Sequence, residues 1–578
     1  MLAVAMTLGA SAQLTIGGTQ PVYDNRTNTY LLTLPDTVFG SAYHADVVID
    51  DGVSGVMIDG QDVINDVVFP VVKADTCYSF TFTRGGALTQ STIFFTYLPI
   101  MCITGTFSDS YVTAPVKMIF PDGQGTQLYT AKIKRAGAST NTQWVHKRNY
   151  HVKFIDDNGE KKDVSFFGFR SDNHWRLDAG TRDMIRFRNY AANGLWADFG
   201  TKPYYADKQP NARSYIRGSH VEVFMNNGYF GFYNFTEYMD RKQMKLKKYE
   251  LIDTDEDDDS VQLHGMMWKS MSKTPQTLFS VVSIFPPDNT LDSWEGFELE
   301  YPEIDDVCPT DYSLLANAVN FVARSDDATF SSQVGEYFDL PVLADYYMFI
   351  NVVFGIDNAC TNMVWNCYDL NDDKKLTLAV WDLDATVGQH FSDENGYYHA
   401  DVIQPENELE DVPTNMCGLK SNRLFMRLKT LPQFNRMVVN RYWQLRETIL
   451  QPDSLVARYG AIYNRLENCG ALGREASRWS DTGDIAHRFL VFDEEYEYLC
   501  DWLRRRIAYL DTHTFACLRG DVNNDGSVNI SDVVMIINYL LSDNAPSSFN
   551  HVNADVDAND DISISDAIAL INMLIDLK

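Results

Sequence analysis

The hydrophobic and polar positions change their period along the chain, and the change divides it into regions. Between residues 14 and 95, short β-branched and aromatic runs alternate with turn residues, as in TNTYLLTLPD, ADVVIDDG, DVVFPVVKAD and CYSFTFTRGG. Short strands at this spacing predict a small antiparallel β-sandwich. Its sequence has no cluster of candidate catalytic or metal-binding residues, so we expect a structural or spacer domain.

The longest region, residues 98 to 514, begins with strands and becomes mostly helical. The strand-like runs are VKMIFPDG, LYTAKIKRAG, NYHVKFIDD and HVEVFMNNGYFGFYNFTEYM. The helical runs, apolar at every third or fourth position, are LPVLADYYMFINVVFG, LFMRLKTLPQFNRMVVNRYWQLRETIL and EEYEYLCDWLRRRIAYL. This order predicts an α+β arrangement with a cleft between the two parts.

One acidic pattern occurs twice near the C-terminus, as GDVNNDGSVNISD and NADVDANDDISISD, and each copy precedes an apolar helix. Such internal repetition is far less frequent by chance than a single copy. In an EF-hand-type loop, calcium takes oxygen ligands from positions 1, 3, 5, 7, 9 and 12. The predicted calcium ligands are Asp521, Asn523, Asp525, Ser527, Asn529 and Asp532 in the first loop, and Asp555, Asp557, Asn559, Asp561, Ser563 and Asp566 in the second.

The two loops differ at position 6, where a sharp turn favours glycine. The first has Gly526, whereas the second has Asp560. We therefore expect the second loop to be more strained and to bind calcium more weakly.

Position 12 is Asp in both loops, and neither loop follows a convincing helix. With these features the repeat resembles the type I dockerin, which docks secreted enzymes onto cohesin domains of scaffold proteins. The resemblance implies two calcium ions, a cohesin partner and a cohesin-facing surface around Ile530, Ser531, Ile564 and Ser565. The alternative is a tail that calcium holds together without any partner, because so small a unit needs the metal merely to fold.

The segment GIDNACTNMVWNCYDLNDDKKLTLAVWDLDATVG carries the densest chemistry of the long region. Asp357 lies five residues before Asn362, and a predicted strand, KLTLAVWDLD, brings Asp382 and Asp384 onto one face. Protein kinases have their parts in this order: the first Asp positions the hydroxyl nucleophile, and the Asn and the later Asp hold magnesium on the triphosphate. Asp-x-Asp before a glycine is also ordinary turn chemistry.

The segments KIKRAGASTNTQWVHKRNYHVKF, WRLDAGTRDMIRFRNYAANGL, GYFGFYNFTEYMDR and VWDLDATVG occur in this order. Together they resemble the spore coat protein CotH family of atypical secreted kinases. The resemblance implies a two-lobed kinase-like domain that binds ATP with magnesium or manganese and phosphorylates Ser or Thr of secreted proteins. The loop from Arg135 to Ser139 departs from the family's usual Arg-Gly-Asn-Ser pattern.

The resemblance also implies roles for individual residues. Asp357 is the implied catalytic residue, and Asn362 with Asp384, or with its neighbour Asp382, is the implied metal site. Lys153 is the candidate phosphate-binding lysine, with Glu237 as its ion-pair partner; alternatively, Lys153 is a surface strand residue and Glu237 caps local backbone. We interpret Arg186 and Arg188 as structural ion-pair residues that brace the cleft.

The net charge of the chain indicates which classes of partner are unfavourable. A formal charge of -31 repels nucleic acid phosphates and anionic lipid head groups, so we expect no nucleic acid partner. The first residues, MLAVAMTLGASAQ, resemble the end of a secretory signal cleaved after Ala12, although they could instead be a first strand. No later apolar run is long enough to span a membrane, so we expect a secreted or cell-surface protein.

The predicted division is a signal remnant (1–12), a β-sandwich (13–96), a kinase-like domain (97–515) and a dockerin (516–578). The predicted function is an exported protein kinase tethered to a cohesin scaffold. One alternative is a non-catalytic structural or adhesive component of a cellulosome-like, polysaccharide-degrading complex. Another is a glycan-active enzyme, although no pair of carboxylates is assignable to acid and base roles.

Overall fold

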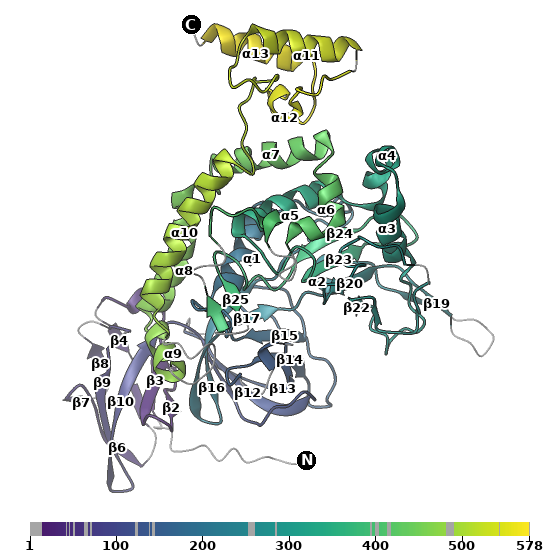
Figure 1. Ribbon diagram of the computed structural model, residues 1–578. Helices are drawn as coiled ribbons and strands as arrows, with labels where there is room; N and C mark the ends of the chain where they lie inside the picture. The colour runs from purple at the N-terminus through teal and green to yellow at the C-terminus, as the bar shows by residue number, and fades with distance from the viewer. Residues whose placement is uncertain are drawn as a thin grey trace.

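The computed structural model describes residues 14–41, 43–45, 47–49, 52–62, 67–69, 72–74, 76–121, 125–137, 139–141, 145–252, 260–283, 286–392, 396–398, 404–412, 418–480, 490–542 and 544–576. The predicted signal remnant, residues 1–12, lies outside this set. The chain is a mixed α+β protein that is rich in strands at its N-terminal end and in helices toward its C-terminal end, as the sequence predicted (Figure 1).

The N-terminal region contains a six-stranded sheet of order β2-β3-β10-β9-β6-β7 and two short ribbons, β1-β5 and β4-β8. Its core includes Tyr30, Leu32, Phe80 and Phe95. The expectation of purely antiparallel strands is wrong in one place: β3 and β10 pair in parallel, because the intervening strands provide the long crossover that parallel pairing needs. The strands are β1 Leu14–Ile16, β2 Val22–Asp24, β3 Thr29–Thr33, β4 Tyr43–Ala45, β5 Val47–Ile49, β6 Val53–Ile58, β7 Gln61–Asp62, β8 Val67–Phe69, β9 Tyr78–Arg84 and β10 Ala87–Thr96.

The next seven strands form a closed barrel of order β11-β12-β13-β14-β15-β17-β16. Alternate residues fill its interior, among them Val152, Trp175 and Phe235, and the residues between them face outward. The strands are β11 Ile100–Ile103, β12 Val112–Ile119, β13 Thr126–Ala136, β14 Asn149–Ile155, β15 His174–Asp178, β16 Gly218–Met225 and β17 Gly228–Glu237.

A second sheet, of order β21-β22-β20-β23-β24, packs with the helices into the largest hydrophobic core. Further two-stranded ribbons are β18-β19 and β25-β26. The strands are β18 Glu250–Ile252, β19 Ser260–Gln262, β20 Met266–Ser270, β21 Ser293–Trp294, β22 Phe297–Tyr301, β23 Met363–Cys367, β24 Thr377–Val380, β25 His390–Ser392 and β26 Gly396–Tyr398.

Most of the helices contribute residues to the largest hydrophobic core, and α10 leads to the C-terminal module (Figure 1). The apolar segment 424–450 is divided by Pro432, which is favoured in the first turn of a helix and so begins α7. The helices are α1 Arg188–Phe199, α2 Arg241–Met244, α3 Ser313–Arg324, α4 Asp327–Tyr337, α5 Leu340–Val353, α6 Arg423–Leu428, α7 Pro432–Arg446, α8 Pro452–Asn468, α9 Ala471–Trp479, α10 Phe492–Thr512, α11 Ile530–Ser542, α12 His551–Ala554 and α13 Ile564–Asp576.

The C-terminal module has its own small core, formed by residues such as Val522, Ile536, Phe549 and Leu570. Its short helix α12 lies toward α7, and α11 and α13 lie on the side away from the rest of the chain (Figure 1). Val552 of α12 packs against the main core. The module is therefore in contact with the preceding helices.

Candidate functional site

Five carboxylates from distant segments gather where the barrel meets the second sheet. Asp384 follows β24, and the pKa of its carboxyl is raised well above the usual value, first by burial and then by other negative charges. These charges belong to Asp382, Asp178, Asp357 and Asp183. Since like charges disfavour one another, the cluster is poised to accept a cation.

The turn after β24 differs from the sequence prediction. The strand ends at Val380, so Asp382 and Asp384 do not alternate along an extended strand. Asp382 has a left-handed backbone (φ 52°), and Asn358 holds the turn by donating its amide to the carbonyl of Trp381 at 2.8 Å. Both carboxylates are half-buried and near each other, because the turn, and not strand alternation, directs them.

Asp357 lies just after α5, which ends where Phe354 adopts a left-handed backbone. One oxygen of its carboxylate accepts a hydrogen bond from Thr361 and the other from Asn362, both at 2.8 Å. Burial, together with the charge of Asp382, raises the pKa of Asp357 to about 6. Asn362 has φ 54°, so strained, non-glycine backbone positions adjoin this carboxylate, as they often do at functional sites.

Asp178 is a member of the cluster that the sequence analysis did not select. It ends β15, and its carboxylate accepts a hydrogen bond from the side-chain amide of Asn189 at 2.8 Å. The side-chain oxygen of Asn189 in turn accepts the backbone N–H of Leu383 at 3.1 Å. Asn189 thereby joins the end of the barrel strand to the turn that carries Asp382 and Asp384.

Two cations face the acidic cluster, and the sequence analysis missed both. Arg176 lies on the outer face of β15; it is 8% exposed, and its guanidinium lies 5.1 Å from the ring centre of Trp381. Among the described residues the side chain of Arg176 has no hydrogen bond or ion pair, and its Nε is buried without a partner. Lys269 of β20 pairs with Glu300 at 2.6 Å. Both positive charges oppose the rise in the pKa of Asp382.

The residues around Asp384 are oxygen donors, the kind that a hard divalent cation takes. However, no three of the five carboxylates, all of which the structure describes, bring ligand atoms within 4.8 Å of one another as those of the second calcium loop do. Among the described residues, the carboxylates of Asp382 and Asp384 accept no hydrogen bond from the protein. The amide nitrogen of Asn362 is used by Asp357, which leaves its oxygen as an acceptor. Magnesium is commonly held by one or two carboxylates and completed by phosphate oxygens and water, so a complete protein shell is not needed.

The two predicted calcium loops have the same hydrogen-bond pattern. In the first, Asp521 accepts the N–H groups of Asp525 and Gly526, and Asp532 accepts those of Val522, Asn523 and Asn529. In the second, Asp555 and Asp566 accept the equivalent N–H groups. This pattern curls each loop around the carboxylates at its positions 1 and 12.

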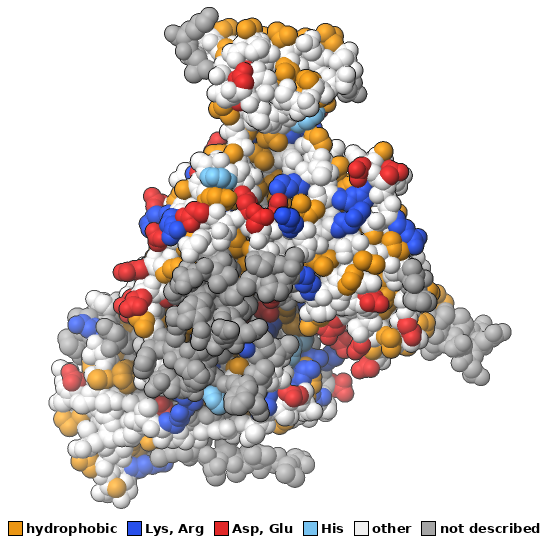
Figure 2. Space-filling view, in the orientation of Figure 1, with side chains coloured by type: hydrophobic (Ala, Val, Ile, Leu, Met, Phe, Trp, Pro, Cys, Tyr) orange, Lys and Arg blue, Asp and Glu red, His pale blue; other side chains and the backbone are white. Residues whose placement is uncertain are grey.

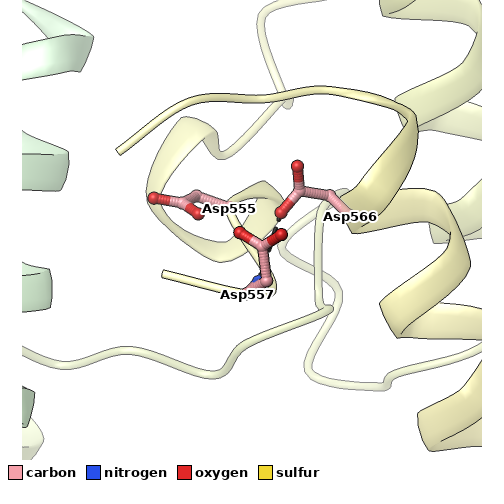
Figure 3. A group of neighbouring side chains, drawn as sticks. All are labelled: Asp555, Asp557 and Asp566. Carbon is pink, nitrogen blue, oxygen red and sulfur yellow. Dashed lines mark hydrogen bonds between the residues drawn. The ribbon is translucent and has the colours of Figure 1, made fainter. Parts of the chain in front are cut away.

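The second loop brings three carboxylates together (Figure 3). Ligand atoms of Asp555, Asp557 and Asp566 lie within 4.8 Å of one another, a spacing suited to one shared cation. Asp560, at position 6, has φ 70°, close to the 84° of Gly526, so this residue adopts the backbone that glycine accepts more easily. Weaker calcium binding by the second loop stays a prediction.

Comparison with known families identifies two regions. The family model described as CotH kinase protein matches residues 133–510, which is more than half of the chain. The chain belongs to the CotH family. The model of the type I dockerin domain matches residues 519–575, and dockerins of this type generally bind calcium and imply a cohesin partner. No curated protein matches the chain.

The ion pair predicted between Lys153 and Glu237 is not formed in the CotH domain. Lys153 pairs across the sheet with His174, whereas Glu237 pairs with Trp175, which points into the barrel. Because neighbours along a strand face opposite sides, Lys153 and Glu237 lie on opposite faces of the barrel wall. Glu237 binds Arg217 at 2.8 Å, and the ammonium of Lys153 lies 5.1 Å from the ring centre of Tyr111.

A buried lysine–glutamate pair does occur in the CotH domain, between Lys147 and Glu475 of α9, at 2.7 Å. Arg186 also binds Glu475, at 3.1 Å. Arg188 binds Asp183 at 2.7 Å and Glu495 of α10 at 2.6 Å, and its side chain is fully buried. The interpretation of Arg186 and Arg188 as structural ion-pair residues is confirmed.

A cavity of about 1030 Å³ lies elsewhere in the CotH domain, between α1 and α8, and none of the five carboxylates lines it. Its walls include Tyr190, Asn193, Arg217 and Ile462. The candidate site is therefore chosen by the chemistry of the acidic cluster and not by the size of this cavity.

Of the helices that the structure describes, none has the length and apolar character to cross a membrane.

Proposed function

We propose that the CotH domain, residues 97–515, is a two-lobed kinase-like domain that transfers the γ-phosphoryl group of ATP to Ser or Thr of secreted proteins. The observation that carries the proposal is the convergence of Asp357, Asn362, Asp382 and Asp384 with a facing Arg176, whose guanidinium has no ion-pair partner in the part of the chain that the structure describes. Phosphoryl transfer depends mainly on alignment and on neutralising charge, and these side chains supply both.

In this proposal Asp384, helped by Asn362 and Asp382, holds magnesium or manganese, which would neutralise charge on the phosphate oxygens. Asp357 orients the substrate hydroxyl and takes up its proton as the oxygen bonds to the γ-phosphorus. The bond from that phosphorus to the bridging oxygen breaks, and ADP leaves. The hydrogen bonds from Thr361 and Asn362 fix the orientation of the Asp357 carboxylate.

Arg176 is assigned to the phosphates of ATP. A buried guanidinium is costly without an anionic partner, and the triphosphate supplies one. Lys153 stays a second phosphate-binding candidate, because it lies on the same outer face of the barrel as His174 and Arg176. Glu237 is not proposed as the partner of Lys153, because its carboxylate forms ion pairs with Arg217 and Arg213.

Replacing Arg176 with Ala is expected to raise the KM for ATP about tenfold to hundredfold. The reason is the loss of one charge-assisted hydrogen bond to a phosphate, which is worth about 1.5–3 kcal/mol. Arg176→Lys should retain part of the affinity. Lys202→Ala is the control, because Lys202 is an exposed cation outside the barrel that donates to the carbonyl of Pro210 at 2.9 Å. A KM for ATP that stays within twofold in Arg176→Ala would contradict the assignment.

The dockerin is proposed to tether the exported enzyme to a cohesin scaffold. Large apolar side chains are exposed on α11 and α13, including Ile530 and Ile564 at 66% and 62% exposure. Ser531 is also exposed, and Ser565 is half-exposed. Exposed apolar groups of this kind mark interaction surfaces, and Figure 2 draws several of them on the outer side of the module.

Incubation of the purified full chain with labelled ATP, manganese or magnesium, and a Ser-rich secreted protein tests the proposed activity. Incorporation of label that requires the metal and is lost in Asp357→Ala supports the kinase. Absence of nucleotide binding supports the alternative, a non-catalytic structural or adhesive component of a polysaccharide-degrading complex. Release of sugars from plant polymers would instead favour a glycan-active enzyme.

A further inference from the structure

The second calcium loop of the dockerin touches the CotH domain through one buried side chain. Asn440, on α7, is 6% exposed. Its amide nitrogen donates to Oδ2 of Asp555 at 2.6 Å and to Oδ1 of Asp560 at 2.8 Å. These are positions 1 and 6 of the loop. A helix of the CotH domain therefore forms hydrogen bonds with the residue that begins the loop and with the residue at its sharp turn.

Arg519 extends this contact from the dockerin side. One of its guanidinium nitrogens donates to the side-chain oxygen of Asn440, and another donates to the backbone carbonyl of Asp555, each at 2.6 Å. All the polar atoms of the Asn440 amide are therefore engaged by the second loop and its flanking residue. Nearby, Trp443 of the same helix donates to the carbonyl of Phe515 at 2.9 Å.

The first loop has no equivalent contact among the described residues. The carboxylates of Asp521 and Asp532 accept N–H groups of their own loop, and Gly526 has no side chain to offer. The two loops, alike in their internal hydrogen bonds, thus differ in what lies outside them. Asp560, where the first loop has glycine, supplies an oxygen that Asn440 binds.

We propose that the second calcium loop is an intramolecular docking surface, in which calcium binding and attachment of the dockerin to α7 stabilise each other. Asn440 can bind Asp555 and Asp560 together only when the loop is curled around its cation site. Calcium favours this curled form because it neutralises the repulsion among Asp555, Asp557 and Asp566. By linkage, docking must raise calcium affinity by the same factor by which calcium strengthens docking.

This arrangement fixes the dockerin without using its outer helices. Helices α11 and α13 lie on the side of the module away from α7 (Figure 1), and of their exposed apolar residues Met573 lies beside α7. A partner that binds those helices therefore need not displace Asn440. The strain of a non-glycine residue at position 6 is offset by the contact that its carboxylate makes with the CotH domain.

Calcium titration calorimetry of the full chain, combined with hydrogen exchange over residues 432–446, tests the proposal. Asn440→Ala is expected to weaken one of two calcium sites at least about fivefold, the lower end of typical coupling between sites. Addition of calcium should slow exchange in α7 of the wild-type chain, and this protection should disappear in Asn440→Ala.

Asp560→Gly is the second variant, because glycine suits φ 70° and keeps the loop able to fold. It should still bind two calcium ions but lose the calcium-dependent protection of α7. Gln444→Ala is the matched control: Gln444 lies on α7, lines the groove between this helix and the dockerin, and accepts a hydrogen bond from Arg441 through its side chain. Unchanged calcium affinity and unchanged α7 protection in both Asn440→Ala and Asp560→Gly would overturn the proposal, whether or not the CotH domain proves to be a kinase.

Discussion

Asp384→Asn is expected to lower the rate of metal-dependent phosphoryl transfer about 10³-fold and, at the same time, to stabilise the protein. Asparagine keeps the shape of the side chain but removes the charge that would hold the cation, and contacts to developing charge are worth this much in other enzymes. The stability should rise because burial and four neighbouring carboxylates disfavour a charged Asp384 in the folded chain.

The opposite signs of these two effects separate a functional carboxylate from a structural one. Asp183→Asn is the matched control within the same cluster, because Asp183 binds Arg188 at 2.7 Å and accepts the N–H groups of Ile185 and Arg188. Burial raises the pKa of Asp183 as well, but its replacement takes one of two carboxylate partners from the fully buried Arg188, so that variant should be less stable than the wild type. Activity assays and thermal unfolding of both variants give the comparison, and a destabilised Asp384→Asn with full activity would contradict the proposed role.

Glu475→Ala is expected to cost about 3–5 kcal/mol of unfolding free energy, the usual cost of removing one partner of a buried ion pair. Glu475 is fully buried and binds Lys147 at 2.7 Å, Arg186 at 3.1 Å and the N–H of Phe232 at 3.2 Å. Its removal leaves two buried cations without their anion. Burial already lowers the pKa of Lys147 to about 8 even with Glu475 present.

Urea unfolding of the full chain, followed by near-ultraviolet circular dichroism, measures this loss. Glu475→Gln should lose less, because its side chain can still accept hydrogen bonds from Lys147 and Phe232. Glu497→Ala, an exposed position on α10, is the control and should change stability by no more than about 0.5 kcal/mol. A Glu475→Ala protein as stable as this control would mean that the buried network contributes nothing to stability.

The sequence predicted those features that depend on local pattern. Alternation of apolar residues located β13, β14, β16 and β17, and the spacing of acidic residues located both dockerin loops. The sequence analysis selected Asp357 and Asn362 from their spacing of five residues, and the hydrogen bond between their side chains is a finding of the structure. Each of these signals lies within a single short segment.

The features that the sequence did not predict depend on pairing between distant segments. Arg176 and Asp178 alternate with Trp175 and Leu177 on β15, so a polar face was visible, but nothing local indicated that this face meets the turn after β24. The opposite orientations of Lys153 and Glu237 follow from strand register in the barrel, which local pattern does not fix. Likewise, the contact of Asn440 with the second calcium loop depends on the position of α7 beside that loop, which no local pattern indicates.

The most direct test of the central claim is to locate manganese and nucleotide by anomalous scattering in crystals of the full chain, soaked with manganese and a non-hydrolysable ATP analogue in excess calcium. Calcium fills the dockerin loops, so a remaining manganese peak reports on the CotH domain. The account predicts that peak at the carboxylate of Asp384, with the triphosphate beside Arg176 and its γ-phosphate toward Asp357. Nucleotide bound elsewhere, for example in the cavity beside α1, with no metal at Asp382 or Asp384, would contradict it.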